Sequence, residues 1–308
     1  MRRAVTPLLL VAVLAGCGGG GEDETAGAPA PAATATAAPA TGGGGASPYI
    51  GSLAVDPGDG TLLAGTGLGL FRVAPGARRG KPVEGELTTP DATGAVSPNL
   101  VLRFTGPGEL LGSGHPADPA SGLPEFLGLI RSDDGGASWE SVSLLGKEDL
   151  HSLDAEGDVV AGHPVEETAL VVSGDGGRTF EERTPPGLPI DVDLDPQDPR
   201  RMGLTTADGF YVSRDGGGSW RQRDVLTVET RLAWAPDGTL FRVDASGAVK
   251  ASDDGGESWE DAGNTGPGPT AVTVDDRGRL YVALPGAEIV RSADGGRSFA
   301  PLARLTAG

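Results

Sequence analysis

The stretch Ser132-Asp133-Asp134-Gly135-Gly136-Ala137-Ser138-Trp139 decides how this chain folds, because its pattern returns four more times before the C-terminus. The pattern is Ser-x-Asp-x-Gly-x-(Ser/Thr)-(Trp/Phe). The other copies begin at Ser173, Ser213, Ser252 and Ser292, so that successive copies start 39 to 41 residues apart. A constant period of about forty residues, with strand-like stretches between the copies, is typical of propeller and solenoid arrays.

Each copy has the composition of a tight turn between two strands. Glycine adopts positive φ without steric cost, and Ser and Asp side chains can accept hydrogen bonds from the amides of their own loop. The aromatic residue begins the next strand, where it can wedge between neighbouring sheets. A calcium loop at Asp253-Asp254-Gly255 is excluded, because the spaced oxygen ligands and the closing Glu are missing. We expect a structural role for Ser132, Asp134, Gly136, Trp139, Ser173, Asp175, Gly177, Phe180, Ser213, Asp215, Gly217, Trp220, Ser252, Asp254, Gly256, Trp259, Ser292, Asp294, Gly296 and Phe299.

The residues around each copy predict four strands per unit. In the last unit these strands cover residues 270–274, 280–284 and 288–291 and a stretch from 299 onward, separated by Gly- and Asp-containing turns. Period-two alternation with such turns indicates an antiparallel meander. Residues 50–76 repeat the same order with a degenerate turn, which makes a sixth unit. We therefore predict an all-β, six-bladed propeller without helices. Seven blades are the alternative, and they would need another blade within the surplus residues at 79–98 and 114–124.

The N-terminus has the features of an export signal. Met1-Arg2-Arg3 is followed by an apolar stretch, 4–15, that is too short to span a bilayer as a permanent helix. The stretch ends in Leu14-Ala15-Gly16-Cys17, which resembles the lipobox of bacterial lipoproteins. That resemblance implies a signal peptide at 1–16 and a lipid on Cys17, which is the only cysteine in the chain.

The sequence after Cys17 predicts a tether and one large domain. Residues 17–47 are rich in Gly, Ala, Pro and Thr and contain little to bury, so we expect a disordered segment. Residues 48–308 suit a single propeller. We expect the protein in the bacterial cell envelope, lipid-anchored on the outer side of the plasma membrane, or in the outer membrane if the cell has one.

The charge balance narrows the choice of partners. The chain has 43 acidic and 24 basic residues, for a formal net charge of −19. Such a chain is a poor partner for nucleic acid, whose recognition depends on basic side chains. We expect a monomer whose acidic surface serves solubility or binds divalent ions weakly, without a defined site. The four Trp and three Tyr residues fall mostly in strands and turns, which argues against a broad aromatic platform for polysaccharides.

Candidate functional side chains gather at the end of the propeller opposite the turns. In a four-stranded meander the second-to-third loops and the links between blades share that end. The three histidines of the chain all fall there, in two adjacent blades, with carboxylates nearby. Histidine with carboxylate suits a Zn or Cu site or acid–base chemistry. The candidates are His115, His151, His163, Asp149, Glu166 and Glu167; the alternative is that polar residues simply collect in loops.

The turn phrase resembles the Asp box, or BNR repeat, of sialidase-like propellers. The stretches 111–116, 127–133 and 143–151 are similar to a group of exported bacterial propellers, many of them lipoproteins, that are usually labelled glycosyl hydrolases. In that superfamily the boxes lie away from the active site, at the opposite end. This chain departs from the group at 49–53, where the resemblance implies histidines flanking the first strand.

Several functions fit these features. A true sialidase needs an arginine triad, a Tyr/Glu nucleophile pair and an acid/base Asp, and its Arg-containing phrase before the first blade is absent here. Arg103 and Arg231 are expected on innermost strands and could bind an anion. We expect a membrane-anchored binding or assembly module; the alternative is a glycosyl hydrolase that uses the His/carboxylate face on a glycan. A third resemblance is to photosystem II assembly-factor propellers, which also act by binding.

Overall fold

The computed structural model describes residues 49–306, apart from 97–98, 166–167 and 227–228. Cys17, the signal peptide and the tether lie outside the described residues, as do Glu166 and Glu167. No helix among the residues described is long and apolar enough to cross a membrane.

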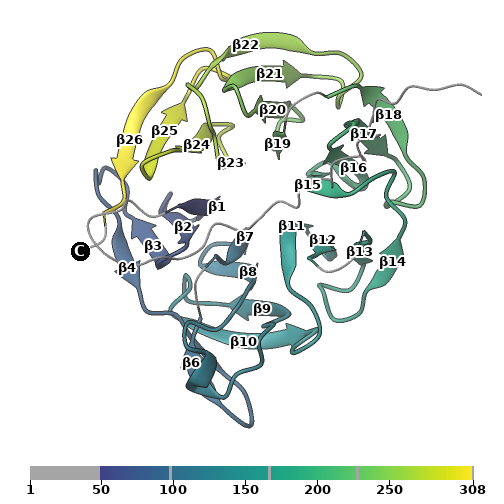
Figure 1. Cartoon of the computed structure of the whole chain (residues 1–308). Helices are drawn as coiled ribbons and strands as arrows, with labels where there is room; N and C mark the ends of the chain where they lie inside the picture. Colours follow the sequence, from purple (N-terminus) through teal and green to yellow (C-terminus); the bar gives the residue numbers. More distant parts are fainter. Residues whose placement is uncertain (1–48, 97–98, 166–167, 227–228, 307–308) are drawn as a thin grey trace, which may run out of the picture. The chain divides into compact units, whose positions relative to one another are not determined.

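The described chain is an all-β propeller of six blades (Figure 1). Blade 1 contains β1 (Ile50–Val55), β2 (Leu62–Thr66), β3 (Gly69–Val73) and β4 (Lys81–Val83). Blade 2 contains β7 (Val101–Gly106), β8 (Glu109–Ser113), β9 (Leu129–Ser132) and β10 (Ser138–Ser143). Blade 3 contains β11 (Leu150–Glu156), β12 (Val159–Pro164), β13 (Leu170–Ser173) and β14 (Glu181–Arg183).

The second half of the ring repeats this order. Blade 4 contains β15 (Pro189–Asp195), β16 (Asp198–Thr206), β17 (Gly209–Ser213) and β18 (Arg221–Asp224). Blade 5 contains β19 (Thr230–Trp234), β20 (Leu240–Asp244), β21 (Ala248–Ser252) and β22 (Glu260–Asn264). Blade 6 contains β23 (Ala271–Val274), β24 (Leu280–Leu284), β25 (Glu288–Ser292) and β26 (Ala300–Arg304).

The first strand of each blade lies innermost, and each innermost strand contacts its neighbours on both sides, including β1 with β23 (Figure 1). Every blade consists of consecutive strands of the chain, so the ring closes between blades 6 and 1 by packing and not by exchange of a strand. The prediction of six antiparallel blades is confirmed, and the seven-bladed alternative is wrong.

The surplus residues of blade 2 form an addition to its outer edge. A hairpin of β5 (Glu86–Thr88) and β6 (Thr93–Ala95) joins the sheet there, with β5 parallel to β10. Leu87 of β5 pairs with Trp139 and is fully buried. A single 3₁₀ turn, η1 (Pro119–Ser121), follows Asp118, whose side chain accepts a hydrogen bond from the Ala120 amide. Apart from this turn, the expectation of no helix holds for the described residues.

The five copies of the turn phrase, called the repeat loops below, have one hydrogen-bond pattern. In the blade 4 copy the Ser213 hydroxyl donates to Asp215 Oδ1 at 2.8 Å and accepts from the Gly217 amide at 2.9 Å. The Ser219 amide and hydroxyl donate to the two oxygens of Asp215. The second glycine of each copy has positive φ, as at Gly217 (80°), which favours glycine there. The predicted structural role of the phrase therefore has a physical basis in each loop.

The hydrophobic core lies between adjacent blades. Trp139 of blade 2 is 1% exposed and belongs to a cluster with Leu63 and Leu70 of blade 1. Another cluster joins Phe71 of blade 1 to Ile289 of blade 6. Because each blade is a twisted sheet with two buried faces, apolar side chains of both faces fill these gaps. The packing fixes the relative positions of the loops at either end of the ring.

Candidate functional site

Two of the predicted histidines meet on one carboxylate. His115 follows β8 in blade 2, while Asp149 and His151 stand at the start of β11 in blade 3. Nε2 of His115 lies 3.0 Å from Asp149 Oδ2, and Nε2 of His151 lies 3.1 Å from the same oxygen. The side chain of Asp149 is only 4% exposed, whereas that of His151 is 56% exposed. We call the end of the propeller that carries these residues the histidine face.

The geometry makes His115 a cation. Its Nδ1 lies 2.9 Å from the carbonyl oxygen of Glu125, which can only accept a hydrogen bond, so Nδ1 carries a proton. Burial opposes ionisation of Asp149, but the hydrogen bonds from His115 and His151 outweigh it and lower the pKa of Asp149 to about 2. The hydrogen bond to Asp149 likewise raises the pKa of His115. The imidazolium and the carboxylate therefore hold each other in their charged forms.

His163 does not join this contact. Its ring is buried, and its Nδ1 lies 2.9 Å from the carbonyl oxygen of Ala169. Burial lowers the pKa of His163, so it is held as a neutral imidazole. The structure thus brings together three of the six candidates, His115, His151 and Asp149. It places His163 apart from them, bonded to its own blade.

The arrangement does not support the expected Zn or Cu site. Among the residues that the structure describes, no group of three or more His, Cys, Asp or Glu side chains could hold a metal ion. The physical reason is that the imidazole nitrogens already have hydrogen-bond partners. A metal needs an imidazole nitrogen with a free lone pair, and both nitrogens of His115 are engaged with acceptors. Glu166 and Glu167, the other proposed ligands, lie outside the described residues.

Charged side chains of the innermost strands fill the central channel. Arg103 of β7 forms an ion pair with Asp154 of β11 at 2.7 Å. Burial, strengthened by neighbouring Asp154, raises the pKa of Asp193 well above its usual range. Burial also raises the pKa of Asp191. Arg103 lies on an innermost strand, as expected, and it lines a cavity of about 70 Å³ with Asp154, Asp191 and Asp193.

These channel carboxylates accept hydrogen bonds from backbone amides of the next blade. Asp154 accepts a hydrogen bond from the Leu194 amide at 2.7 Å. Asp193 accepts from the Trp234 amide, and Asp191 from the Leu232 amide, both at 2.9 Å. An innermost strand has an open edge toward the axis, and its buried amides need such acceptors. The acids therefore join blades 3, 4 and 5.

The cavity beside the histidine face is small. It measures about 90 Å³ and is lined by His151, Asp191 and Arg231 among others. Arg231 uses its guanidinium on the Ile190 carbonyl and the Glu229 carboxylate, at 3.0 and 2.6 Å. Ligand pockets for small molecules usually measure about 300–1,000 Å³. As far as the described residues form it, this cavity is therefore too small to enclose a sugar ring.

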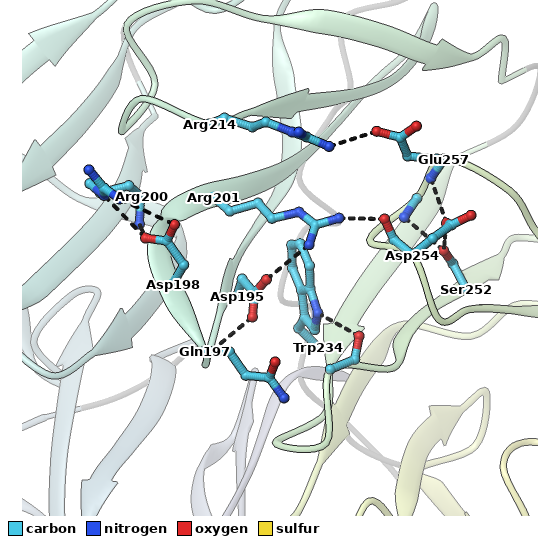
Figure 2. Close-up of polar contacts among 12 residues, drawn as sticks. Asp195, Gln197, Asp198, Arg200, Arg201, Arg214, Trp234, Ser252, Asp254 and Glu257 are labelled. Carbon is cyan, nitrogen blue, oxygen red and sulfur yellow. Dashed lines mark hydrogen bonds and ion pairs between the residues drawn. The ribbon is translucent and has the colours of Figure 1, made fainter.

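The repeat-loop end carries a second polar network, which the sequence analysis did not predict. At the junction of blades 4 and 5, Arg201 forms an ion pair with Asp195 (3.3 Å) and donates to the carbonyl oxygen of Asp254 in the blade 5 repeat loop (2.5 Å; Figure 2). The Arg201 guanidinium also lies over the ring of Trp234, 5.3 Å from its centroid.

A carboxylate of the same repeat loop completes this junction. Glu257 accepts from Arg214 at 2.6 Å and from Arg223 at 2.8 Å, both in blade 4 (Figure 2 draws the Arg214 contact). The sequence shows this junction only indirectly: Arg214 and Arg223 belong to one unit, and the acidic Glu257 lies inside the repeated phrase of the next unit. The larger clefts also lie at this end, about 380 Å³ between blades 3 and 4 and about 320 Å³ at the mouth of the channel.

Comparisons with known proteins show the fold and no family. No family model matches the chain, and a search of the curated proteins finds no relative. Among solved structures, the GH74 xyloglucanase from Xanthomonas campestris is 18% identical and gives a TM-score of 0.51, covering 84% of this chain and 46% of the enzyme. The chain thus spans less than half the length of that enzyme.

Two further structures are similar. Streptogramin B lyase is 13% identical with a TM-score of 0.54, covering 84% of this chain and 83% of the lyase. YCF48 bound to D1 peptide is 18% identical with a TM-score of 0.46, covering 71% of this chain and 70% of YCF48. Identities this low show the propeller fold alone, which hosts many functions.

Proposed function

We propose that this chain is a lipid-anchored, extracytoplasmic propeller that binds a protein partner and carries out no hydrolysis. This proposal rests mainly on the contacts of Asp149 with two histidines. Its buried carboxylate is ionised and clamped between His115 and His151, beside a cavity of only about 90 Å³. A small cavity at that face, as the described residues line it, suits recognition of a macromolecular surface better than enclosure of a substrate.

The glycosyl hydrolase alternative needs two carboxyl groups in a pocket, one protonated and one ionised, on either side of a glycosidic bond. Burial raises the pKa of three carboxyl groups, Asp191, Asp193 and Glu156. Asp191 and Asp193 lie in the channel, where they accept hydrogen bonds from the next blade. Glu156 lines the cleft of about 320 Å³ at the repeat-loop end. Asp191 and Asp193 are therefore engaged in joining blades, and Asp149 at the histidine face is ionised by its two histidines. The likeness to a xyloglucanase, at 18% identity, shows the fold alone and assigns this chain no acid and base.

The place of the protein in the cell follows from its first residues. The lipobox-like Leu14-Ala15-Gly16-Cys17 supports attachment of a lipid to Cys17. The repeat loops, whose Ser and Asp side chains close each turn, support membership of the Asp-box propellers. The stretches 111–116, 127–133 and 143–151 support a place among their exported bacterial lipoproteins. Such an anchor would hold the propeller at the outer side of the membrane, near partners in the envelope.

A hydrolysis assay tests the proposal. The full chain, solubilised in detergent, is incubated with sialosides, xyloglucan and a panel of aryl glycosides, beside Asp149→Asn and Asp191→Asn variants. We expect no release of product above background in any of the three. Turnover by the wild type that falls at least a hundredfold in either variant would overturn the proposal, because it would assign a catalytic role to a carboxylate.

A further inference from the structure

The junction between blades 6 and 1 is the one at which the following blade has no intact repeat loop. At four junctions a side chain of one blade donates to a carbonyl oxygen of the next blade's repeat loop. These bonds are Arg72 to Gly135, Ser143 to Gly177, Arg183 to Gly216 and Arg201 to Asp254. Blade 1 has no intact repeat loop. Its junction with blade 6 contains a cavity of about 200 Å³.

The strand register identifies what blade 1 has lost. The first Ser of the phrase pairs with the start of the second strand, as Ser292 does with Leu280, and Val73 holds that position opposite Leu62. The loop that follows, residues 74–80, has the same length as its counterpart 293–299. It places Pro75 where the phrase has Asp and Gly80 where it has the aromatic. The side chains that fold a repeat loop onto its neighbour are therefore missing.

Other contacts hold only the second half of this loop. The Arg304 amide donates to the Arg78 carbonyl at 3.1 Å, and Arg78 Nη1 donates to the Pro301 carbonyl at 2.5 Å. The side chain of Leu305 takes the space beside Gly80, where a Cβ would lie 2.3 Å from it. Residues 74–76 make no hydrogen bond to blade 6 within the described chain, and they form one wall of the cavity.

Blade 6 nevertheless keeps the side chains that bind a repeat loop elsewhere. Arg279 precedes Leu280 as Arg201 precedes Met202, and it pairs with Asp275 (2.5 Å) as Arg201 pairs with Asp195. Arg291 occupies the register position of Arg72, which holds the blade 2 repeat loop. Both Arg279 and Arg291 line the cavity.

Arg291 is the unused cation of this cavity. Within the described residues it has no carboxylate or carbonyl partner, and its neighbour is the Tyr281 hydroxyl, which also contacts Asp275 at 3.0 Å. The carboxylates nearby are already engaged: Asp275 by Arg279, and Asp59 by the Thr61 amide. Asp276 lies 3.9 Å from Arg277. A guanidinium whose side-chain partner is a neutral hydroxyl, and not a carboxylate, is a site for a carboxylate from elsewhere.

We propose that this cavity binds an acidic turn of a partner protein, one that presents a main-chain carbonyl to Arg279 and a carboxylate to Arg291. The molecule supplies a template for the Arg279 contact, because Arg201, its counterpart in blade 4, binds the Asp254 carbonyl of the blade 5 repeat loop (Figure 2). The Glu257 carboxylate of that loop binds Arg214 and Arg223, whose register positions in blade 6 are Ala293 and Leu302. The carboxylate for Arg291 is therefore inferred from the charge of Arg291 and not from this template. A volume of about 200 Å³ accommodates one or two residues of such a turn. This inference rests on the proposed function and names its partner chemistry.

A cyclic peptide with the sequence of residues 252–259 is the probe, measured by calorimetry against the full chain in detergent. We expect the wild type to bind the peptide, and Arg291→Ala to weaken this binding at least tenfold. Arg291→Lys should restore part of the affinity. A peptide in which Glu is replaced by Gln should also bind more weakly. Arg291 has no ion pair to lose in the described chain, only a hydrogen bond with the Tyr281 hydroxyl, so its variants should melt close to the wild type. Arg304→Ala removes the same charge from the same blade outside the cavity and should bind as the wild type does.

No binding by the wild type, or equal binding by wild type and Arg291→Ala, would overturn the proposed site. These results leave the proposed function standing when the same preparation shows no glycan turnover. Turnover sensitive to Asp149 or Asp191 would instead remove the proposed function, whatever the peptide does.

Discussion

The Nε2 atom of His115 lies 3.0 Å from Oδ2 of Asp149, and this contact ties blade 2 to blade 3 at the histidine face. Asp149→Asn should destabilise the protein by roughly 2 kcal/mol near pH 6, because it leaves a half-buried imidazolium without its counter-charge. Urea unfolding at several pH values measures this effect. Asp208→Asn, at an exposed carboxylate without a side-chain partner in the described chain, is the control.

The pH dependence of that loss has a definite sign. The pKa of His115 is raised in the folded protein, so its contribution is fully present below about pH 6.5 and disappears as pH rises through the folded pKa. The difference between wild type and Asp149→Asn should therefore shrink in alkaline solution. A difference that stays constant up to pH 9 would contradict the imidazolium assignment.

The repeat loops should respond to loss of their serine. Ser213 is 1% exposed, and its hydroxyl is the acceptor for the Gly217 amide. Ser213→Ala leaves that buried amide unsatisfied and should cost about 1–2 kcal/mol of unfolding free energy. Thermal and urea unfolding measure the loss, with exposed Ser141→Ala as the neutral control. Binding elsewhere on the molecule should be unchanged; a variant that lost binding at unaltered stability would assign a functional role to the loop.

Acid should unfold the protein partly through the same loops. Hydrogen bonds from the Ser219 hydroxyl and, to a smaller extent, from the Ser219 amide lower the pKa of Asp215 to about 2. A depressed carboxylate pKa stabilises the folded state above the unfolded pKa, near 4, and this contribution is lost as pH falls toward 2. The melting temperature of Asp215→Asn should thus lie below that of the wild type at pH 6 and meet it near pH 2. Parallel curves over this whole interval would refute the loop's part in acid sensitivity.

The fold could be predicted from sequence because one local pattern recurs in five of the six blades. Ser132 and its equivalents fix the third-to-fourth turn, and the remaining strands follow from alternation around it. The hairpin β5–β6 could not be predicted in this way. Its strands have three residues each and lack an alternating pattern, and Leu87 is placed by packing against Trp139 of a strand that is distant in sequence.

The candidate site was predictable only in position. Strand ends correctly placed His115, Asp149 and His151 at one end of adjacent blades, but which nitrogen faces which oxygen depends on side-chain geometry. The residue types suggested a metal site. In the structure, His115 and His151 both contact the same Asp149 oxygen, so the residues form an ion-paired cluster instead. Arg201 and Asp254 are 53 residues apart, so their contact becomes visible only when blades are superimposed by register.

The anchor is tested by one substitution outside the described residues. Cys17→Ser should release the protein from membranes, because the acyl chains provide stable attachment and the following segment has no apolar stretch of its own. Fractionation into soluble and membrane pools measures this, with Ser47→Ala as a control that leaves the lipobox intact. A processed serine variant that still sediments with membranes would rule out the lipid anchor.

A zinc titration distinguishes an ion-paired cluster at the histidine face from a metal site. We expect that titration of the full chain with zinc at pH 7.5 gives the same isotherm for the wild type and for His115→Ala/His163→Ala. The Nδ1 and Nε2 atoms of His115 face the Glu125 carbonyl and the Asp149 carboxylate, and Nδ1 of His163 faces the Ala169 carbonyl. A metal would have to break two charge-assisted contacts to reach His115, and protons compete more strongly as pH falls. A wild-type site that is absent from the double variant and weakens below pH 6 would show that these rings turn toward a metal after all.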